Sequence, residues 1–500
     1  MKALEQLCAA ALARDSDRQA VEFEGHWYDW GQMRHVAERV HALLEGSGAG
    51  PNAPVIFVPR NRPSALATLL ALMAQGRTIR MIYAFQSPLG IARDIARLQS
   101  PLVIAAEQDF SPEVKETLRA HGIAGIAIED MDAHAVADFE RATFSVDADA
   151  PRAPRIEILT SGTTGTPKQF PVSYATIATF LGGGNRMADA QMDLAQAPPL
   201  LLYFPLGNIT GIYSTVPPLV KNQRVVLLDR FALDKWHKFV VRYRPVASGI
   251  PPAAMQMLLE ANIPPEDLAS IKAMGIGAAP LDPTVQRAFE ERYNIPILLS
   301  YGATEFAGPV TAMTADLHAR WGKQKFGSVG RPIGGAQLRV IDPETNESLP
   351  PGHDGLLEVV SPRIGPNWIR TSDIGVIDAD GFLFLHGRAD GAIMRGGFKI
   401  LPETIERALL LHPAVAAASV VGVPDQRLYA VPGVAIQIKK GREQPGIAEL
   451  ESHLRQHVLA THIPVHWRFV DTLPKTPSFK VNRPAVKQLF EAQDQDALLP

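Results

Sequence analysis

The chain has 500 residues, more than one hydrophobic core usually organises, so at least two domains are expected. Its 49 basic and 52 acidic residues nearly balance, which excludes a protein that binds nucleic acid or an anionic membrane through its overall charge. The single cysteine, Cys8, excludes an intramolecular disulfide and a cluster of thiolate metal ligands, and we expect it to be a small buried residue.

The amino-terminal sequence MKALEQLCAAALARD starts like a secretion signal, but Glu5 and Gln6 interrupt its apolar stretch. The apolar residues recur at helical spacing instead: Leu4, Leu7, Cys8, Ala11 and Leu12. The longest apolar runs, such as 66–74, are about half of the roughly twenty residues that a membrane-spanning helix requires. We therefore expect an amphipathic helix, a cytoplasmic chain and no membrane span.

Helical patterns then alternate with short β-branched runs. Strands are expected at 53–59, 101–107, 223–229 and 295–302, and helices at 63–75, 112–122, 233–244 and 283–294. This alternation is typical of a large α/β domain. Between about 326 and 387 the pattern changes to short strands separated by glycine and proline, which predicts a small antiparallel or β-barrel-like subdomain.

A new α+β pattern begins after residue 388. It consists of a helix at 402–412, a strand at 415–425 and a helix at 446–462. The sequence therefore predicts a large N-terminal α/β domain at 1–388 with the small β-barrel-like subdomain, and a small α+β C-terminal domain at 389–500.

The stretch LTSGTTGTPK at 159–168 concentrates glycine, hydroxyl residues and a lysine. Gly162 and Gly165 permit backbone angles that let successive N–H groups point into one concavity, which can bind an oxyanion. Hydroxyl donors come from Ser161, Thr163 and Thr164. Lys168 adds a mobile positive charge suited to the outer phosphates of a nucleotide. The spacing is not that of the Walker loop, and a solvated turn between strands is the alternative.

Five further segments follow in order: GAAPL (277–281), SYGATE (300–305), TSDIG (371–375), GRADGAIMRGGFKILPETIE (387–406) and PKTPSFKVNR (474–483). With the first stretch they resemble the signatures of the adenylate-forming superfamily, which contains acyl-CoA and aryl-CoA synthetases, peptide-synthetase adenylation domains and firefly luciferase. The resemblance spans residues 155 to 483, whereas the first 150 residues match only in length and α/β pattern.

The resemblance implies an ATP or AMP site. Its residues are Thr160, Ser161, Gly162, Thr163, Thr164, Gly165, Lys168, Gly277, Ala278, Ala279, Pro280, Ser300, Tyr301, Gly302, Asp373 and Arg388. Within this set, the Tyr301 ring stacks on adenine in the family, and Asp373 and Arg388 bind the ribose hydroxyls. Read alone, Tyr301 could be a core tyrosine and Asp373 a turn cap. Ser372 stands where the family usually has glycine.

The same resemblance assigns Thr304 to a phosphate contact and makes Glu305 the ligand of Mg²⁺. A carboxylate is a hard ligand that Mg²⁺ accepts beside nucleotide phosphates, although a lone glutamate is more often solvated. Among the remaining departures from the family pattern, Gln169 replaces the glycine expected after Lys168.

Lys480 is expected to carry the first chemical step. The prolines and serine around it indicate a loop, from which an ammonium can reach an active site. By resemblance it bridges the substrate carboxylate and the α-phosphate, where a cation stabilises the transition state more than the ground state. Considered alone, Lys480 would be a surface lysine without a catalytic role. Phe479 replaces the glycine that usually precedes it.

The family performs two half-reactions and rotates its small domain between them, so the predicted C-terminal domain is a small mobile α+β domain. Asp390 matches the hinge position. Gly396 and Gly397 would let the backbone approach the pantetheine arm of coenzyme A, and Lys399 could contact phosphate.

The acid pocket is expected to be apolar. By resemblance it is lined by Phe204, Asn208, Gly277, Gly302, Gly308, Pro309 and Val310. Family members commonly have histidine at the position of Asn208. No aspartate lies between 199 and 228, where amino-acid-activating members place one, so an uncharged aryl, alicyclic or medium-chain acid is favoured.

These features predict an acid–thiol ligase, an AMP-forming acyl-CoA synthetase that uses ATP, Mg²⁺ and coenzyme A with a small-molecule carboxylic acid. We expect a monomer or homodimer without a nucleic-acid partner. An enzyme that passes the acyl group to a carrier protein is the alternative, and a nucleotide-binding protein without turnover is the alternative from another class.

Overall fold

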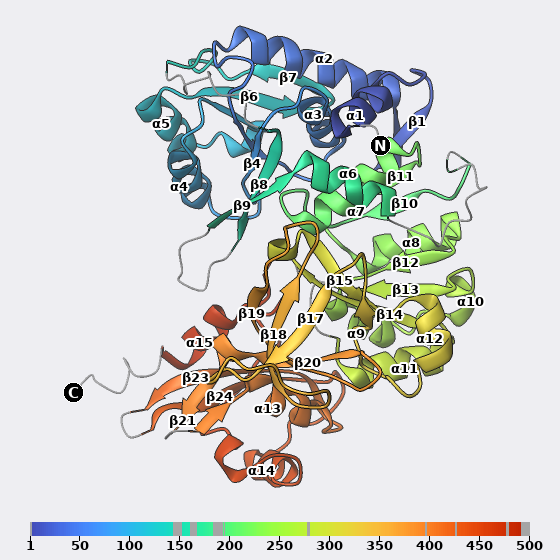
Figure 1. Cartoon of the computed structure of the whole chain (residues 1–500), viewed down its shortest axis with the longest axis vertical. Coiled ribbons are helices and arrows are strands. Elements are labelled where there is room, and N and C mark those ends of the chain that lie inside the picture. The colour runs from blue at the N-terminus through green and yellow to red at the C-terminus, as the bar shows by residue number, and fades with distance from the viewer. Residues whose placement is uncertain are drawn as a thin grey trace. The chain divides into compact units, whose positions relative to one another are not determined.

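The computed structural model of the chain describes residues 3–143, 153–160, 168–183, 194, 196–277, 281–395, 398–425, 428–476 and 480–491 (Figure 1). Two compact units make up the chain. The first consists of Met1–Ser248, Pro264–Lys272 and Gly302–Gly308, and the second of Gly249–Ile263, Ala273–Tyr301 and Pro309–Pro500.

A seven-stranded sheet lies in the first unit. Its strand order is β7 (Asp132–Ala135), β6 (Ala124–Glu129), β5 (Leu102–Ala106), β3 (Val55–Val58), β4 (Ile79–Met81), β8 (Arg155–Thr160) and β9 (Lys168–Ser173). The central strands from β6 to β8 pair in parallel, while β7 and β9 are antiparallel edges. The central parallel strands with intervening helices confirm the predicted α/β class.

Helices cover both faces of this sheet. They are α1 (Leu4–Leu12), α2 (Trp30–Gly46), α3 (Pro63–Ala74), α4 (Pro88–Leu98), α5 (Pro112–His121) and α6 (Tyr174–Gly183). Residues of β3 divide between two cores, because Val55 and Phe57 pack with α1, α2 and α3 whereas Ile56 and Val58 pack with α4 and α5. Successive side chains of a strand point to opposite faces, so a strand covered on both faces is apolar throughout.

Local sequence sets where these helices begin. Asp29 caps α2 in a reciprocal capping box with Gln32. Serine caps followed by proline start α4 at Ser87 and α5 at Ser111. Such caps satisfy backbone N–H groups that the first turn leaves without partners, and proline at the first helical position loses no hydrogen bond there.

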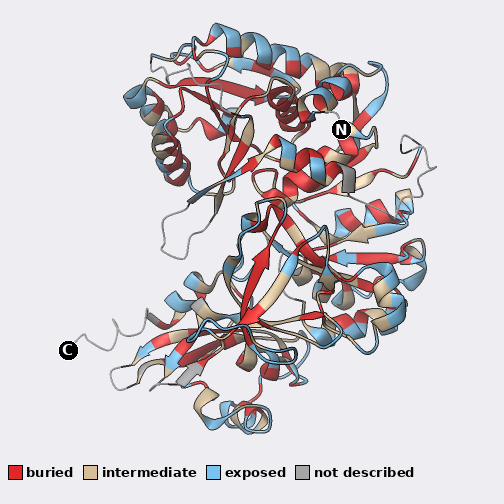
Figure 2. Cartoon of the chain, viewed as in Figure 1, coloured by how far each residue is buried: buried red, intermediate tan, exposed pale blue. Residues whose placement is uncertain are grey.

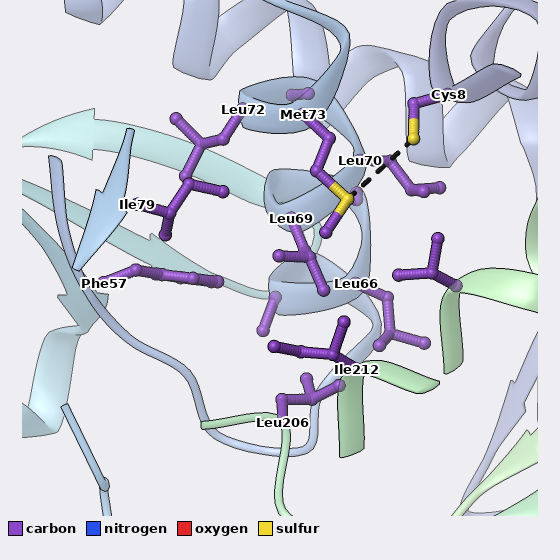
Figure 3. Close-up of a cluster of buried hydrophobic side chains, with 14 of the residues drawn as sticks. Cys8, Phe57, Leu66, Leu69, Leu70, Leu72, Met73, Ile79, Leu206 and Ile212 are labelled. Atoms are coloured by element: carbon purple, nitrogen blue, oxygen red, sulfur yellow. Dashed lines mark hydrogen bonds between the residues drawn. The ribbon is translucent and has the colours of Figure 1, made fainter. Parts of the chain in front are cut away.

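Helix α3 is buried from Pro63 to Met73 (Figure 2 shows it in the interior of the unit). Leu66, Leu69 and Leu70 line the cluster drawn in Figure 3. There the Cys8 thiol contacts Met73 Sδ at 3.9 Å, and burial raises the pKa of Cys8 to about 12. Cys8 is therefore the small buried residue that the sequence predicts. No helix in the described ranges is long and apolar enough to cross a membrane.

Four more strands and two helices complete the larger elements of this region. The strand order is β10 (Leu200–Leu202), β11 (Val225–Leu227), β1 (Gln19–Phe23) and β2 (His26–Asp29). Strand β11 pairs in parallel with both β10 and β1. The helices are α7 (Ile209–Val220) and α8 (Leu233–Tyr243).

A five-stranded sheet has the order β12 (Ala247–Gly249), β13 (Ala273–Ile276), β14 (Ile297–Ala303), β15 (Gly308–Ala312) and β16 (Arg331–Pro332). The helices in this stretch of the chain are α9 (Pro252–Glu260), α10 (Pro265–Leu268), α11 (Pro283–Tyr293) and α12 (Ala315–Trp321). The next four strands form an antiparallel sheet in the order β17 (Gln337–Ile341), β18 (Gly355–Val360), β19 (Ile369–Ile377) and β20 (Leu383–Arg388). This open sheet is the small unit expected between 326 and 387, in its antiparallel rather than its barrel-like form.

The last sheet has the order β22 (Phe398–Ile400), β21 (Ile393–Arg395), β24 (Tyr429–Ile438) and β23 (Val415–Asp425), with β25 (His466–Phe469) paired to β24. Its helices are α13 (Pro402–Leu410), α14 (Ile447–Leu454) and α15 (Arg483–Glu491). The helix expected at 446–462 is wrong beyond Leu454, where α14 ends. The later apolar residues do not continue one buried face, since Leu459 is 69% exposed.

Candidate functional site

The glycine-rich stretch 159–168 joins two antiparallel strands. Strands β8 and β9 pair so that Thr160 lies opposite Lys168. Ser161, Gly162, Thr163, Thr164 and Gly165 lie outside the described residues, as do the side chains of Thr160 and Lys168. The loop therefore leaves the carboxyl end of β8, a strand parallel to β4, and this edge of an α/β sheet is where ligands usually bind.

A buried carboxylate supports the strand that leads into this loop. Glu157 on β8 is 5% exposed, and it accepts a hydrogen bond from Arg80 Nε at 2.9 Å and pairs with Arg155 at 2.6 Å. Arg80 lies on the neighbouring strand β4, so the ion pair holds the two strands together. A buried charge with two partners is satisfied, and it gives β8 a fixed register before the loop.

Gly277, which directly follows β13, lies beside Ser300 in the parallel strand β14. Ile276 of β13 pairs with Leu299 of β14, which brings the next residues of each strand side by side. A Cβ atom at Gly277 would lie 2.7 Å from Ser300 Oγ, so any side chain at this position would displace the hydroxyl. The three residues that follow, Ala278, Ala279 and Pro280, lie outside the described residues.

Tyr301, Asp373 and Arg388 form one hydrogen-bonded group. The Tyr301 hydroxyl donates to Asp373 Oδ2 at 2.5 Å, and Arg388 Nη1 lies 3.8 Å from Asp373 Oδ1. Strands β19 and β20 pair so that Asp373 lies opposite Arg388. Burial raises the pKa of Tyr301, and the negative charge of Asp373 raises it further, which keeps the hydroxyl protonated as a donor.

Ser372 is a contact that sequence reasoning missed. Arg388 Nη2 donates to Ser372 Oγ at 2.5 Å, so the guanidinium is held by the hydroxyl as well as by the carboxylate. Glycine, the usual residue at this position in the adenylate-forming pattern, has no hydroxyl to offer. The departure from that pattern was itself the signal, and the structure gives it a role in orienting Arg388.

Lys480 lies on a short turn of the second unit. Lys475 and Val481 form an antiparallel bridge, and the Thr476 amide donates to the Lys480 carbonyl at 2.7 Å. The residue is exposed, yet crowding by the surrounding protein lowers the pKa of its ammonium, and the positive charge of Arg388 lowers it further. The Arg388 charge is therefore one of the two causes of the lowered pKa of Lys480.

Thr304 and Glu305 lie on the single turn η2 (Thr304–Phe306) after β14. Phe306 is 2% exposed and anchors the turn, while Glu305 is exposed. Within the described ranges no partner neutralises the Glu305 carboxylate, and no group of three or more ligand residues forms a metal cage. Mg²⁺ bound with nucleotide phosphates needs only one or two carboxylates, so this arrangement fits such an ion.

The residues expected in the acid pocket occupy defined positions. Asn208 is the N-cap of α7, where its side-chain oxygen accepts from the Gly211 amide at 2.7 Å. Gly308 has a φ of +113°, and a Cβ atom there would lie 2.8 Å from Tyr213 Cε2. The Tyr213 ring stacks on Phe180 with centroids 4.0 Å apart. Sequence reasoning missed this stacked pair, since nothing distinguishes it from other apolar helix residues.

The other pocket candidates differ in exposure. Phe204 is half-buried, with its ring centroid 4.4 Å from that of Tyr203. Gly302 is exposed. In the second unit the Pro309 carbonyl accepts a hydrogen bond from Arg363, and Val310 is fully buried. Val310 therefore contributes to the protein interior whether or not a ligand reaches it.

The expected hinge lies in the turn η3 (Ala389–Gly391). The side chain of Asp390 is outside the described residues, as are Gly396, Gly397 and the side chain of Lys399, whose backbone pairs with Met394. The described neighbours are closely packed, since a Cβ atom at Gly387 would lie 2.5 Å from Glu403 Oε2 and one at Gly391 would lie 3.4 Å from Arg483 Nη1.

A family model described as AMP-binding enzyme matches residues 8–366, and one described as AMP-binding enzyme C-terminal domain matches residues 404–480. A sulfoacetate–CoA ligase of Cupriavidus necator is 29% identical, and the match covers 92% of each chain. The 4-coumarate–CoA ligase 3 of Oryza sativa subsp. japonica is 26% identical over 99% of this chain and 93% of that protein.

Solved structures share the fold. The ATP-bound structure of MatB from Rhodopseudomonas palustris matches with a TM-score of 0.80 and 21% identity, covering 97% of this chain and 99% of that one. At this identity the likeness concerns the fold, which has a large α/β part followed by a small carboxyl-terminal part. The expected fold class is confirmed.

Proposed function

Because the chain belongs to the family of AMP-binding enzymes, we propose that it is an ATP-dependent carboxylic acid–CoA ligase. The observation that carries the proposal is the joined group of Tyr301, Asp373 and Arg388. This group supplies a flat ring and a carboxylate for a nucleoside, and Lys480 would supply a cation for the reacting phosphate.

Asp373 is proposed to bind the two ribose hydroxyls of ATP. One of its oxygens accepts from Tyr301 and the other faces Arg388, and a carboxylate has further lone pairs for the sugar. Tyr301 would stack on adenine, with its hydroxyl fixed by the same carboxylate. Thr160, Lys168 and the hydroxyl residues between them would contact the phosphates, together with Thr304.

In the first half-reaction an oxygen of the substrate carboxylate attacks the α-phosphorus of ATP. The bond from that phosphorus to the bridging oxygen of the β-phosphate breaks, and pyrophosphate leaves. Lys480 would sit between the two anions and stabilise the charge that develops as they meet. Glu305 would hold Mg²⁺, which when bound neutralises phosphate charge.

In the second half-reaction the thiolate of coenzyme A attacks the acyl carbon of the acyl-adenylate. The bond from that carbon to the phosphate oxygen breaks, and AMP leaves with both electrons. We propose that the turn after Asp390 and the segment with Gly396, Gly397 and Lys399 form the thioester face, and that Asp390 is the hinge between a domain at 1–388 and one at 389–500.

The acid is proposed to be an uncharged aryl, alicyclic or medium-chain acid. The named pocket candidates carry no charge, and aromatic rings gather beside Phe204, where Tyr203 lies 5.2 Å from Phe231 between ring centroids. The relatives named above act on sulfoacetate and 4-coumarate, which differ in charge, so their names favour no single acid. A lining of this kind suits an apolar acyl group.

A panel of acids tests the function. Purified protein with ATP and Mg²⁺ is given benzoate, 4-coumarate, cyclohexanecarboxylate, octanoate or sulfoacetate, with and without coenzyme A. Pyrophosphate is measured in solution and the acyl-CoA thioester by mass. We expect both products with an uncharged acid. Pyrophosphate without thioester would favour loading of a carrier protein, and neither product would favour a nucleotide-binding protein without turnover.

Replacing Asp373 by alanine is expected to raise the KM for ATP about 10- to 100-fold, because two hydrogen bonds to a charged group are lost. The KM for the acid should change much less. Asp354→Ala is the matched control, since it removes an exposed carboxylate that pairs with His386 on the same sheet at 2.5 Å. Equal ATP kinetics in wild type and Asp373→Ala would remove Asp373 from the nucleotide site.

A further inference from the structure

Asn61 is a fully buried amide that binds backbone atoms from two other segments. Its Nδ2 donates to the Phe204 carbonyl at 3.2 Å and to the Leu228 carbonyl at 3.1 Å. Its Oδ1 accepts from the Leu206 amide at 3.2 Å. Both donor hydrogens and the acceptor oxygen are therefore used, as a buried side-chain amide requires.

Asn61 and two of its three partners lie just beyond strand ends. Asn61 follows β3, Phe204 follows β10, and Leu228 directly follows β11. Strand β3 belongs to the seven-stranded sheet and the other two belong to the four-stranded sheet. One side chain thus joins the carboxyl edges of two sheets, the place where loops of α/β proteins carry binding residues.

Two further contacts hold the segment from Phe204 to Asn208, one at its middle and one at its end. The Leu206 side chain is buried in the core cluster with Leu66 and Ile212 (Figure 3). Asn208 caps α7 through the Gly211 amide. Leu206 sets the depth of the segment, whereas Asn61 sets the direction of the Phe204 and Leu206 peptide groups.

We propose that Asn61 is a positioning residue for the acid-binding wall that Phe204 and Asn208 form. This inference rests on the proposed function, and Asn61 acts through the backbone without touching substrate. When the amide is removed, two carbonyls and one N–H group lose their partner, and the segment relaxes to a different position. A shift of about 1 Å in a positioning element can reduce productive binding by as much as 10²-fold.

The test compares Asn61→Ala and the milder Asn61→Ser with Ser100→Ala. Ser100 is the matched control because it is also fully buried and its hydroxyl donates to the Pro54 carbonyl, just before the amino end of β3. We expect the KM for the best acid of the panel to rise about 10- to 100-fold in Asn61→Ala and less in Asn61→Ser. The KM for ATP should stay within about twofold, and Ser100→Ala should change neither.

Hydrogen exchange of the ligand-free proteins gives a second readout. The Leu206 amide should exchange faster in both Asn61 variants than in wild type and in Ser100→Ala, since its acceptor is lost or displaced. An unchanged acid KM in both variants would overturn the proposal, as would equal rises in the KM values for acid and ATP. A wild-type protein that adenylates no acid would overturn the proposed function, and this inference with it.

Discussion

Replacing Lys480 by alanine is expected to slow acyl-adenylate formation about 10²- to 10³-fold, the cost typical of removing one preorganised group that stabilises transition-state charge. Attack of a carboxylate on a phosphate brings two anions together. An ammonium between them lowers the activation barrier, and its removal restores the full repulsion. The rate is measured as pyrophosphate release in a single turnover with ATP, Mg²⁺ and the best acid. Thioester formation from supplied acyl-adenylate should be much less affected.

The structure supplies a control on the same turn. Lys475 lies across the bridge from Val481 and is exposed, so Lys475→Ala removes an equal charge without removing the proposed catalytic group. We expect Lys475→Ala to retain the wild-type adenylation rate within about twofold. If Lys480→Ala kept that rate as well, Lys480 would be a surface lysine and the proposed first half-reaction would lose its cation.

The lowered pKa of Lys480 adds a pH test. Crowding by the surrounding protein and the Arg388 charge favour the neutral amine, so the ammonium is lost at a lower pH than the usual 10.5 of a lysine. Adenylation should therefore decline as the pH rises, beginning below the range of an ordinary lysine. In Arg388→Ala this decline should move to higher pH, because one of the two causes is removed. A decline that does not move would contradict an effect of the Arg388 charge on the pKa of Lys480.

The elements that sequence predicted best have a strong local signal. The strand expected at 415–425 is β23, and the helix expected at 63–75 is α3, which starts at Pro63 as a first-turn proline favours. The prediction of a helix at 446–462 is wrong after Leu454, because the spacing of apolar residues alone does not show which of them are buried. Leu459 fits a helical pattern in sequence yet is exposed.

In the candidate site too, sequence motifs identify residues, whereas contacts between residues distant in the chain appear only in the structure. Motifs identified Tyr301, Asp373 and Arg388 by residue type. The hydrogen bond from Tyr301 to Asp373 joins residues 72 positions apart in the chain, so it depends on how the sheets that carry them pack. The sequence analysis did not predict that Ser372 orients Arg388 or that Asn208 caps a helix. No sequence pattern indicated the role of Asn61, because its hydrogen-bond partners are backbone atoms, which every residue has.

A buried charge cluster beside the expected hinge has no counterpart in the sequence reasoning. Arg483 Nη2 lies 2.9 Å from Glu403 Oε1 and 3.0 Å from Glu406 Oε2, which joins the start of α15 to α13. Burial raises the pKa of Glu406 to about 7, although the charge of Arg483 opposes the shift. The arginine thus holds two carboxylates that would otherwise repel each other in a poorly hydrated place.

Replacing Arg483 by alanine is expected to lower the free energy of unfolding by about 3 kcal/mol at pH 8, the lower end of the cost of removing one partner from a buried ion pair. The lower end applies because the arginine side chain is one third exposed. The measurement is urea unfolding of the full chain. Arg455→Ala is the control, since its pair with Glu451 on α14 is largely exposed and should contribute about 0.5 kcal/mol or less.

The sign of the pH dependence makes this prediction specific. A carboxyl group whose pKa is raised on folding binds its proton more tightly in the folded chain, so stability falls as the pH rises from 4.5 toward 7. Without Arg483 the pKa of Glu406 should rise further and the loss should extend to higher pH. The effect of Arg483→Ala should therefore be larger at pH 8 than at pH 6, and Arg483→Ala with Glu406→Gln should recover part of it. An effect that is equal at both pH values and unrelieved by Glu406→Gln would mean that Arg483 stabilises the fold through packing rather than charge.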